Sequence, residues 1–520
     1  MRFDQLILRD HIERAFARYS TRPAVQAVDG ALTYGELERR ALQLAEILVD
    51  GGVGPGEKVV LLLRNSTDYV VADMAIVLAG ACKVPLNDML AANDVAYMID
   101  HSGASAIIAH SSFVGTIDQI ADTAAKVSVR VELLDDGEPA LTDFNVHAHS
   151  DEGAVPDSSD WPRAAAEDPG LIIYTGGTTG RPKGVFHTQQ ALAVNFFSHL
   201  INAEIAEDER LLICSPLPHS AQQFVMAALL RGAHVTIERS FEAERVLQLI
   251  EERALTWMFM VPTMIYRVLD AQLAKSRDCS SLRTIVYGAS PITAARLRQG
   301  LSTFGPVFLQ IYGQTEIPNL VTTLSKSDHG TEELLTSCGQ PVIFCDVAIR
   351  DEAGDEVAPG EVGEITVRGF YTLERYHENP EKTDAAYTGH YLRTGDVGYQ
   401  NETGHIFLVD RAKDMIISGG MNVYSTEVEN VIQEVTGVGQ VVVIGIPDDD
   451  WGEAVTAFVI PANDDFDPAA VTEKCRERLA RYKVPKRVET VREIPLTPYG
   501  KPDKKALRAS FWGDNIRQVN

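Results

Sequence analysis

Apolar runs alternate with amphipathic stretches along roughly the first 340 residues of the chain. The run at 58–63 is apolar after Lys58, and the run at 171–174 is Leu-Ile-Ile-Tyr; both are typical of strands covered on both faces. Thr33 and Glu36 stand three residues apart before an amphipathic stretch, so a capping box and a helix to about residue 50 are predicted. Further helices are expected over 73–79 and 94–99, and further strands over 83–86 and 106–109. This alternation predicts an α/β fold with multiple layers, in which helices cover parallel sheets.

The pattern of apolar and polar residues changes twice after this region. From about residue 340, short alternating stretches with Gly and Pro turns predict a small β subdomain that extends to about residue 410. Helix-like stretches follow at 425–436 and 469–481, with an apolar strand at 441–444 between them. We therefore expect an N-terminal domain over 1–411, which includes the β subdomain, and a small α+β domain over 412–520.

The composition is that of a globular protein, with 45% hydrophobic and 23% charged residues in 520. A net charge of −26 argues against nucleic acid or an anionic membrane as partner, because both bind basic surfaces. The apolar stretch 69–86 contains Asp73 and Lys83, so a buried helix and strand are predicted there in place of a membrane span. Six scattered cysteines predict free thiols, and the ends of the chain carry neither a signal-peptide pattern nor a peroxisomal signal, so a cytoplasmic location is expected.

Residues 174–184, which read Tyr-Thr-Gly-Gly-Thr-Thr-Gly-Arg-Pro-Lys-Gly, are the first candidate for chemistry. Glycines let backbone N–H groups approach an anion closely, threonine hydroxyls add donors, and Lys183 adds a positive charge. The loop therefore suits a polyphosphate. It is not a Walker loop, because that pattern has Ser or Thr after Gly-Lys, whereas Gly184 follows Lys183 here. The structural alternative is a surface turn that binds nothing.

Four later apolar runs also end in turns. In open α/β sheets, ligands bind at the carboxyl ends of the strands, so these turns are candidate walls of the same site. The runs lie at 211–214, 257–261, 284–287 and 307–312, and the last of them leads into Tyr312-Gly313-Gln314-Thr315-Glu316.

Three further motifs follow along the chain. They are Tyr-Leu-Arg-Thr-Gly-Asp at 391–396, Asp-Arg-Ala-Lys-Asp at 410–414 with Ser-Gly-Gly-Met-Asn-Val-Tyr at 418–424, and Leu-Thr-Pro-Tyr-Gly-Lys at 496–501. With the two earlier motifs, the sequence resembles the adenylate-forming superfamily of acyl-CoA synthetases, peptide-synthetase adenylation domains and beetle luciferases. It is most similar to fatty-acyl and aryl CoA ligases. One departure is Gly176, where serine is usual, so one hydroxyl donor is missing.

The resemblance implies a site for ATP, Mg²⁺ and coenzyme A. Thr315 is then expected to contact the α-phosphate, Glu316 to hold Mg²⁺, and Lys183 to bind phosphate. Lys501 is expected to bind the carboxylate and the α-phosphate, because two anionic reactants need a cation between them. His219 is expected to gate the acyl pocket.

The other implied contacts are spread over several segments. They are Thr175, Gly176, Gly177, Thr178, Thr179 and Gly180 on the phosphates, Gly288, Ala289, Ser290, Tyr312 and Gly313 on the rest of the nucleotide site, Asp396 and Arg411 on the ribose, and Gly419 and Gly420 at the thiol tunnel. Lys413 is implied to be the hinge about which a mobile C-terminal domain turns. Taken singly, each of these motifs is also compatible with a turn that has only a structural role. Lys501 alone is compatible with a solvated surface lysine, and His219 alone with a structural histidine.

The predicted function is ATP-dependent activation of an organic carboxylic acid as acyl-adenylate, followed by transfer of the acyl group to coenzyme A. The acyl pocket is expected to be apolar and to hold a plain organic acid; its residues are Phe224, Val261, 287–291, Ile317 and Pro318. An ATP-dependent amide ligase that uses an amine or amino acid is the alternative. A second alternative is a non-catalytic regulator that binds a nucleotide. The presence of Lys183, Glu316 and Lys501 argues against it. The identity of the acid and the oligomeric state, monomer or homodimer, stay open.

Overall fold

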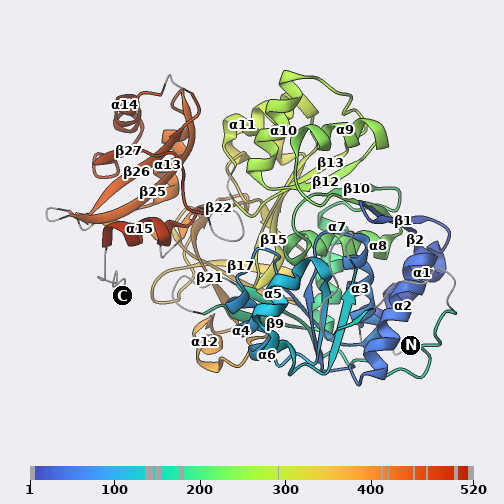
Figure 1. Ribbon diagram of the computed structural model, residues 1–520. Coiled ribbons are helices and arrows are strands. Elements are labelled where there is room, and N and C mark those ends of the chain that lie inside the picture. The colour runs from blue at the N-terminus through green and yellow to red at the C-terminus, as the bar shows by residue number, and fades with distance from the viewer. Residues whose placement is uncertain are drawn as a thin grey trace.

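The computed structural model describes residues 6–134, 144–146, 154–175, 181–290, 292–411, 414–419, 421–448, 451–463, 466–496 and 502–512 (Figure 1). Within these ranges the chain forms two large sheets, a smaller sheet beside them and a separate C-terminal sheet.

The first large sheet carries the strand that leads into the glycine-rich loop. In spatial order its strands are β19 (Arg375–Tyr376), β9 (Lys183–Thr188), β8 (Pro169–Thr175), β4 (Cys82–Pro85), β3 (Lys58–Leu62), β5 (Ala106–His110), β6 (Val129–Leu133) and β7 (Asn145–Val146). Neighbours from β8 to β7 are parallel, whereas β9 is antiparallel to both β8 and β19.

The second large sheet carries the Tyr312–Glu316 segment. Its order is β16 (Gln340–Pro341), β15 (Ile317–Leu324), β14 (Phe308–Gln314), β13 (Thr284–Tyr287), β12 (Trp257–Met260), β10 (Arg210–Ile213), β11 (His234–Ile237), β1 (Pro23–Ala27) and β2 (Gly30–Thr33). The strands from β14 to β1 run parallel, and an antiparallel strand pairs at each end of that block.

Helices separate and cover the two sheets, giving five layers (Figure 1). Between the sheets pack α1 (Leu8–Tyr19), α2 (Tyr34–Asp50), α3 (Thr67–Ala79), α7 (Gln189–Asn202) and α8 (Gln222–Arg231). The second sheet is covered by α9 (Ala243–Arg253), α10 (Pro262–Ala274) and α11 (Ala294–Phe304), and the first by α4 (Ala92–Ser102), α5 (Val114–Gln119) and α6 (Ala121–Ala124). Since α7 contacts β8, β9 and β15, the middle layer fixes the two hairpins of the site relative to each other.

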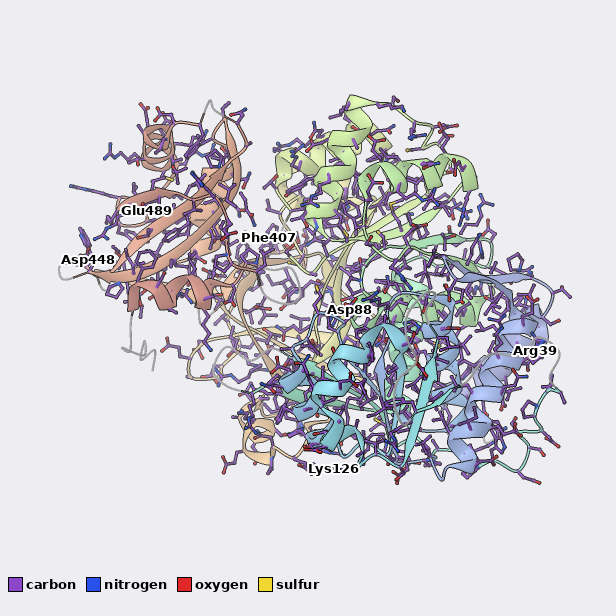
Figure 2. The ribbon with its side chains drawn as sticks, viewed as in Figure 1. Arg39, Asp88, Lys126, Phe407, Asp448 and Glu489 are labelled. Atoms are coloured by element: carbon purple, nitrogen blue, oxygen red, sulfur yellow. The ribbon has the colours of Figure 1, made fainter. Side chains whose placement is uncertain are left out.

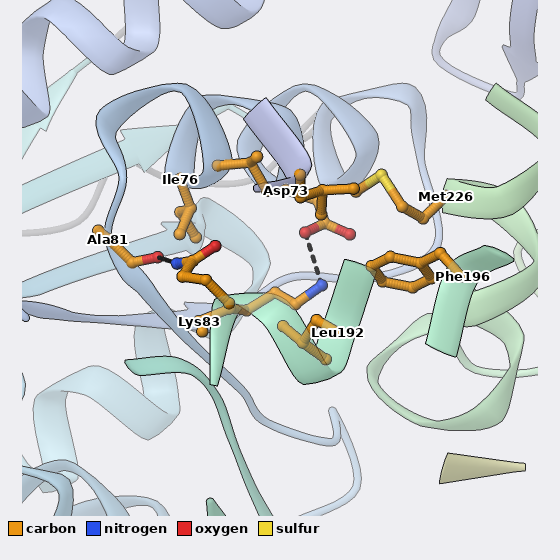
Figure 3. Close-up of a pocket in the computed structure, with 11 residues that line it drawn as sticks. Asp73, Ile76, Ala81, Lys83, Leu192, Phe196 and Met226 are labelled. Atoms are coloured by element: carbon orange, nitrogen blue, oxygen red, sulfur yellow. Dashed lines mark hydrogen bonds and ion pairs between the residues drawn. The ribbon is translucent and has the colours of Figure 1, made fainter. Parts of the chain in front are cut away.

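A buried ion pair lies in the middle layer (Figure 3). Asp73 on α3 and Lys83 on β4 approach to 2.6 Å, and each side chain is only 7% exposed. Leu192, Phe196 and Met226 surround the pair beside a cavity of about 10 Å³. A charge buried among apolar side chains is strongly unfavourable unless it is paired, so this contact joins α3 to the strand next to β8.

The remaining sheets follow in chain order. The smaller sheet contains β17 (Cys345–Arg350), β18 (Gly363–Gly369), β20 (Tyr387–Thr388), β21 (Tyr391–Gln400) and β22 (Ile406–Arg411), with the short helix α12 (Pro380–Ala385) in the same region. The C-terminal part contains β23 (Ile416–Ser418), β24 (Met421–Val423), β25 (Val438–Asp448), β26 (Gly452–Pro461) and β27 (Arg487–Thr490) with α13 (Ser425–Gln433), α14 (Pro468–Arg478) and α15 (Lys504–Trp512). In Figure 2, Phe407 on β22 lies between this part, marked by Glu489, and the body of the molecule.

The α/β expectation is confirmed, and so is the capping box at the start of α2, where Thr33 and Glu36 bond reciprocally. Two expectations need correction. The sheets are mixed, because β8–β9 and β14–β15 are antiparallel hairpins that apolar runs alone do not distinguish from parallel strands. The strand expected at 441–444 spans Val438–Asp448. Residues 69–86 form most of α3 and all of β4 as expected, and none of the described helices is long and apolar enough to cross a membrane. The 411/412 domain boundary stays a prediction.

Candidate functional site

Two hairpins carry the residues of the glycine-rich loop and of the Tyr312–Glu316 segment. Thr175 ends β8 and lies opposite Lys183 on β9, so these two residues flank the loop on neighbouring strands. Thr315 and Glu316 form the two-residue turn between β14 and β15. Gly176, Gly177, Thr178, Thr179 and Gly180 lie outside the described residues.

Tyr376 on β19 connects the two hairpins. Its hydroxyl donates to Oε1 of Glu316 at 2.9 Å, and its ring centroid lies 4.8 Å from Nζ of Lys183. Burial, and then the Glu316 carboxylate, raise the pKa of Tyr376, so the phenol stays protonated and keeps donating. A cation over the ring and a carboxylate at the hydroxyl are therefore held by one tyrosine, an arrangement that suits an anion bound together with its counter-cation.

His187 on β9 contacts the turn of the β14–β15 hairpin. Its Nε2 donates to the carbonyl oxygen of Thr315 at 3.1 Å. Burial lowers the pKa of His187 to about 4, so the ring is neutral near pH 7. The turn that carries Thr315 and Glu316 is thus fixed by both His187 and Tyr376.

Asp396 is the centre of a second polar cluster. Its Oδ2 accepts hydrogen bonds from the Tyr312 hydroxyl at 2.8 Å and from Nε2 of Gln314 at 2.7 Å. Asp396 is buried on β21 beside Gly395, whose φ of +70° suits glycine, and it lies opposite Arg411 in the ladder with β22. Tyr312, Gln314 and Asp396 are therefore brought together, and Arg411 is adjacent through its backbone.

Close backbone contacts explain the glycines between the strands. A Cβ added at Gly288 would lie 2.5 Å from the carbonyl oxygen of Ile311, and one added at Gly313 would lie 2.4 Å from the carbonyl carbon of Asn319. Gly288 follows β13, and the next two residues, Ala289 and Ser290, are exposed; Ala289 has a φ of +68°. The end of β13 thus packs against β14 and leaves the 289–290 backbone accessible.

The residues expected around the acyl group differ in exposure. Phe224 and Tyr287 are fully buried: Phe224 packs on Trp257, and the Tyr287 hydroxyl bonds to His329 at 2.9 Å. Ile317 and Pro318 are also buried, Val261 is partly exposed, and Pro291 lies outside the described residues. The composition of the acyl pocket stays a prediction.

His219 lies in a π-helical turn, Leu217–Ala221, that follows β10. Its backbone departs from helical geometry at φ −117° and ψ −139°. The ring is half-buried, and its Nε2 lies 2.8 Å from Nδ2 of Asn87.

The C-terminal motifs are described in part. Gly419 has a φ of +60°, and its N–H donates to the Trp451 carbonyl at 2.8 Å. Asp410 accepts from the backbone and hydroxyl of Ser425, whose Oγ lies 2.7 Å from Nζ of Lys504. Lys413, Gly420 and Lys501 lie outside the described residues, as does the side chain of Arg411.

The residues present fit Mg²⁺ held largely by a nucleotide. The described part of the chain contains no group of three or more His, Cys, Asp or Glu arranged for a metal. Mg²⁺ is commonly held by one or two carboxylates together with substrate phosphates, and the hydrogen bond from Tyr376 uses Oε1, one of the two oxygens of Glu316.

Sequence reasoning missed Tyr376, His187 and Asn87. Tyr376 and His187 contact the Thr315–Glu316 turn only through strand pairings between distant segments. A polar residue inside an apolar run was the available signal for His187, because a buried polar side chain needs a partner.

Comparisons with known proteins cover nearly the whole chain. A family model described as AMP-binding enzyme matches residues 12–377, and one described as AMP-binding enzyme C-terminal domain matches residues 427–501. Medium/long-chain-fatty-acid–CoA ligase FadD8 of Mycobacterium tuberculosis is 37% identical over 97% of this chain and 90% of its own length. Feruloyl-CoA synthase of an Amycolatopsis species is 36% identical over 94% of this chain and 96% of its own. The structure of amide bond synthetase McbA from Marinactinospora thermotolerans matches with a TM-score of 0.87 at 31% identity, over 97% of this chain and 100% of that one.

Proposed function

Because the chain belongs to the AMP-binding enzyme family, we propose that it is an AMP-forming acid–thiol ligase that activates a carboxylic acid with ATP and transfers the acyl group to coenzyme A. The resemblance inferred from the sequence is confirmed by the family matches and by the relatives. The observation that carries the proposal is the Lys183–Tyr376–Glu316 arrangement, in which one tyrosine contacts a cation from the β8–β9 hairpin and a carboxylate from the β14–β15 hairpin.

In the first half-reaction a carboxylate oxygen of the acid attacks the α-phosphorus of ATP, and the bond to the bridging oxygen of pyrophosphate breaks. The products are acyl-AMP and pyrophosphate. No nucleophilic side chain is needed, since the enzyme holds two anions together and stabilises the charge that develops between them. We assign that work to Lys183, Thr315 and Lys501.

In the second half-reaction the sulfur of coenzyme A attacks the acyl carbon, and the bond to AMP breaks. The thiol loses its proton and AMP leaves with the carboxylate-derived oxygen. We assign Gly419 and Gly420 to the approach of the thiol, because paired glycines allow close contact with backbone, and Lys413 to the hinge between the two half-reactions.

We propose that Tyr312, Asp396 and Arg411 bind the nucleoside, and that Glu316 holds Mg²⁺. When bound, the ion neutralises phosphate charge. Tyr376 orients the Glu316 carboxylate toward that task through its hydroxyl. The backbone of 175–180 and the 288–290 segment, which is exposed at Ala289 and Ser290, complete the nucleotide site in this proposal.

An organic acid with an apolar chain or ring is the substrate class that the apolar residues near β10, β12 and β13 favour. Two curated relatives carry the names of a fatty-acid–CoA ligase and a feruloyl-CoA synthase, which supports both the substrate class and coenzyme A as acceptor. The structural match to an amide bond synthetase favours an amine acceptor as the second candidate. Since the six cysteines are free thiols in the structure, we also propose a reducing, cytoplasmic location.

A pyrophosphate-release assay with octanoate, ferulate and indoleacetate tests the proposal. We expect release that requires ATP, Mg²⁺ and one of these acids, and an acyl-CoA product by mass spectrometry when coenzyme A is present. Lys183→Met is expected to lower release strongly, whereas Lys126→Met, which alters an exposed ion pair with Asp100, is expected to leave it unchanged. Release with no acyl-CoA, but with an amide when free amino acids are supplied, would replace the acid–thiol assignment with the second candidate.

A further inference from the structure

Three buried or half-buried asparagines hold the segment that carries His219. Asn65 donates through Nδ2 to the Ser215 carbonyl at 2.9 Å. Asn319 donates through Nδ2 to the Ser220 carbonyl at 3.0 Å, from a left-handed backbone with φ +64°. Both of these carboxamides contact the backbone of this segment, and Nδ2 of Asn319 also lies 3.1 Å from Nε2 of His199, whereas Asn87 contacts the imidazole of His219 itself.

The orientation of the Asn87 carboxamide is settled by a second bond. The backbone N–H of Met89 donates to Oδ1 of Asn87 at 2.8 Å, so Oδ1 is the acceptor end and Nδ2 faces His219. Asn87 follows β4 at its carboxyl end and is only 2% exposed. A buried side chain with both polar ends engaged has little freedom to rotate.

An NH₂ group only donates, so Nε2 of His219 must accept. The ring proton of the neutral imidazole then resides on Nδ1. Asn87 therefore determines both the tautomer of His219 and the plane of its ring.

We propose that Asn87 is a positioning residue, which holds His219 as the Nδ1–H tautomer and fixes the plane of the ring that is expected to gate the acyl pocket. The catalytic consequence rests on the proposed function, but the tautomer does not. A histidine expected to gate the acyl pocket is then held in one tautomer and one ring orientation, so the loss of Asn87 is expected to affect the reaction through His219.

The tautomer is measured directly on the wild-type apoprotein by ¹⁵N NMR with labelled histidine, with the His219 signal assigned by its loss in His219→Gln. We expect a pyrrole-type Nδ1 and a pyridine-type Nε2 at pH 7.5. A pyrrole-type Nε2 would overturn the proposal whatever the activity of the enzyme. In Asn87→Asp the carboxylate only accepts, so a proton is expected to appear on Nε2.

A double-mutant cycle tests whether Asn87 acts through His219. The probe is whichever of octanoate, ferulate and indoleacetate gives the fastest pyrophosphate release. We expect Asn87→Ala to lower kcat/KM for that acid about tenfold, the typical effect of one hydrogen bond, and less than about twofold when His219 is already alanine. Equal losses in both backgrounds would overturn the proposal, because they indicate a merely structural effect.

Asn319→Gly is the matched control. Glycine accepts the left-handed φ, and the substitution removes a carboxamide that contacts the Ser220 carbonyl next to His219. Its effect is expected to be the same with and without His219. If wild-type enzyme releases no pyrophosphate with any acid, the proposed function fails, and the NMR result still decides the assignment of the tautomer.

Discussion

Tyr376 is the residue on which the charged part of the site depends. It is 8% exposed, and it contacts the Glu316 carboxylate with its hydroxyl and the Lys183 ammonium with its ring. Hydrogen bonds to charged groups are stronger than those between neutral groups, and they fix the direction of the charged group.

Tyr376→Phe keeps the ring and removes the hydroxyl. We expect kcat/KM for ATP to fall about 10- to 100-fold in the pyrophosphate-release assay, because a hydrogen bond to a charged group contributes about 1.5–3 kcal/mol. The control is Tyr391→Phe, which removes a hydroxyl that donates to Asp346 at the surface. Identical activity of the two variants would contradict the role given to Tyr376.

The buried histidines make stability depend on pH. Burial lowers the pKa of His187 and of His199 to about 4, below the ordinary value of 6.5. Between these two values the unfolded chain binds protons that the native chain does not, so stability is retained above pH 6.5 and is lost as the pH falls toward 4. The loss reaches about 3 kcal/mol for each histidine.

Urea midpoints at pH 7.5, 6.0 and 5.0 measure this effect. We expect the midpoint to drop over that range, and to drop less steeply in His199→Gln. His390→Gln, which changes an exposed histidine, is expected to follow the wild type. If the urea midpoint of His199→Gln fell with pH as steeply as that of the wild type, the contribution assigned to His199 would be refuted.

At the scale of single residues, the sequence predicts Lys183, Glu316, Tyr312 and Asp396 because each stands in a local motif. The structure places Lys183 close to Glu316 only through Tyr376, which no motif contains. Such a contact depends on the pairing of β19 with β9, nearly 200 residues apart, and that pairing leaves no local signal.

Two hairpins are the elements that build the site. Helix α7 contacts β8 and β9 of the first large sheet, the strands on either side of the glycine-rich segment, and also β15 of the second large sheet, the strand after the Thr315–Glu316 turn. Apolar runs predict the existence of these strands, but the antiparallel direction of β9 and β15 follows from the short connections that precede them, which the runs alone do not mark. The same runs therefore do not show that Thr315 and Glu316 form a hairpin turn.

The Asp73–Lys83 pair supports the first of these sheets (Figure 3). Lys83→Met leaves a carboxylate buried without its cation, and we expect the free energy of unfolding to fall by about 3–5 kcal/mol. Asp73→Leu combined with Lys83→Met is expected to recover much of the loss, since apolar groups then fill the site.

Arg163→Met is the control for that pair. Arg163 is 46% exposed and pairs with Asp10, and exposed pairs contribute about 0–1 kcal/mol. Urea unfolding of the variants measures the difference. A loss in Lys83→Met as small as that in Arg163→Met would mean that the buried pair contributes little.

At the scale of the whole molecule, two parts of the chain meet at β22. Asp410 on β22 accepts from Ser425 at the start of α13, and Lys504 on α15 contacts the same serine. The separate C-terminal sheet follows from the change of pattern after residue 410, whereas its contacts with β22 depend on tertiary structure that the sequence pattern does not contain.

Lys501→Ala tests whether this C-terminal lysine acts in the adenylation half-reaction alone. We expect adenylation to fall by about 100-fold or more, the usual cost of losing a group that stabilises charge in the transition state. Thioester formation from a supplied acyl-adenylate is expected to be largely intact. Lys505→Ala, which changes an exposed neighbour, is the control, and equal losses in both half-reactions of Lys501→Ala would contradict the assignment.

Oxygen transfer from the acid to AMP is the most direct consequence of an acyl-adenylate. The measurement uses octanoate, ferulate or indoleacetate labelled with ¹⁸O in both carboxylate oxygens, with ATP, Mg²⁺ and coenzyme A, and mass spectrometry of the nucleotide and the thioester. We expect one ¹⁸O in AMP, one in the acyl-CoA and none in pyrophosphate. Unlabelled AMP, or label in ADP or inorganic phosphate, would contradict activation at the α-phosphate.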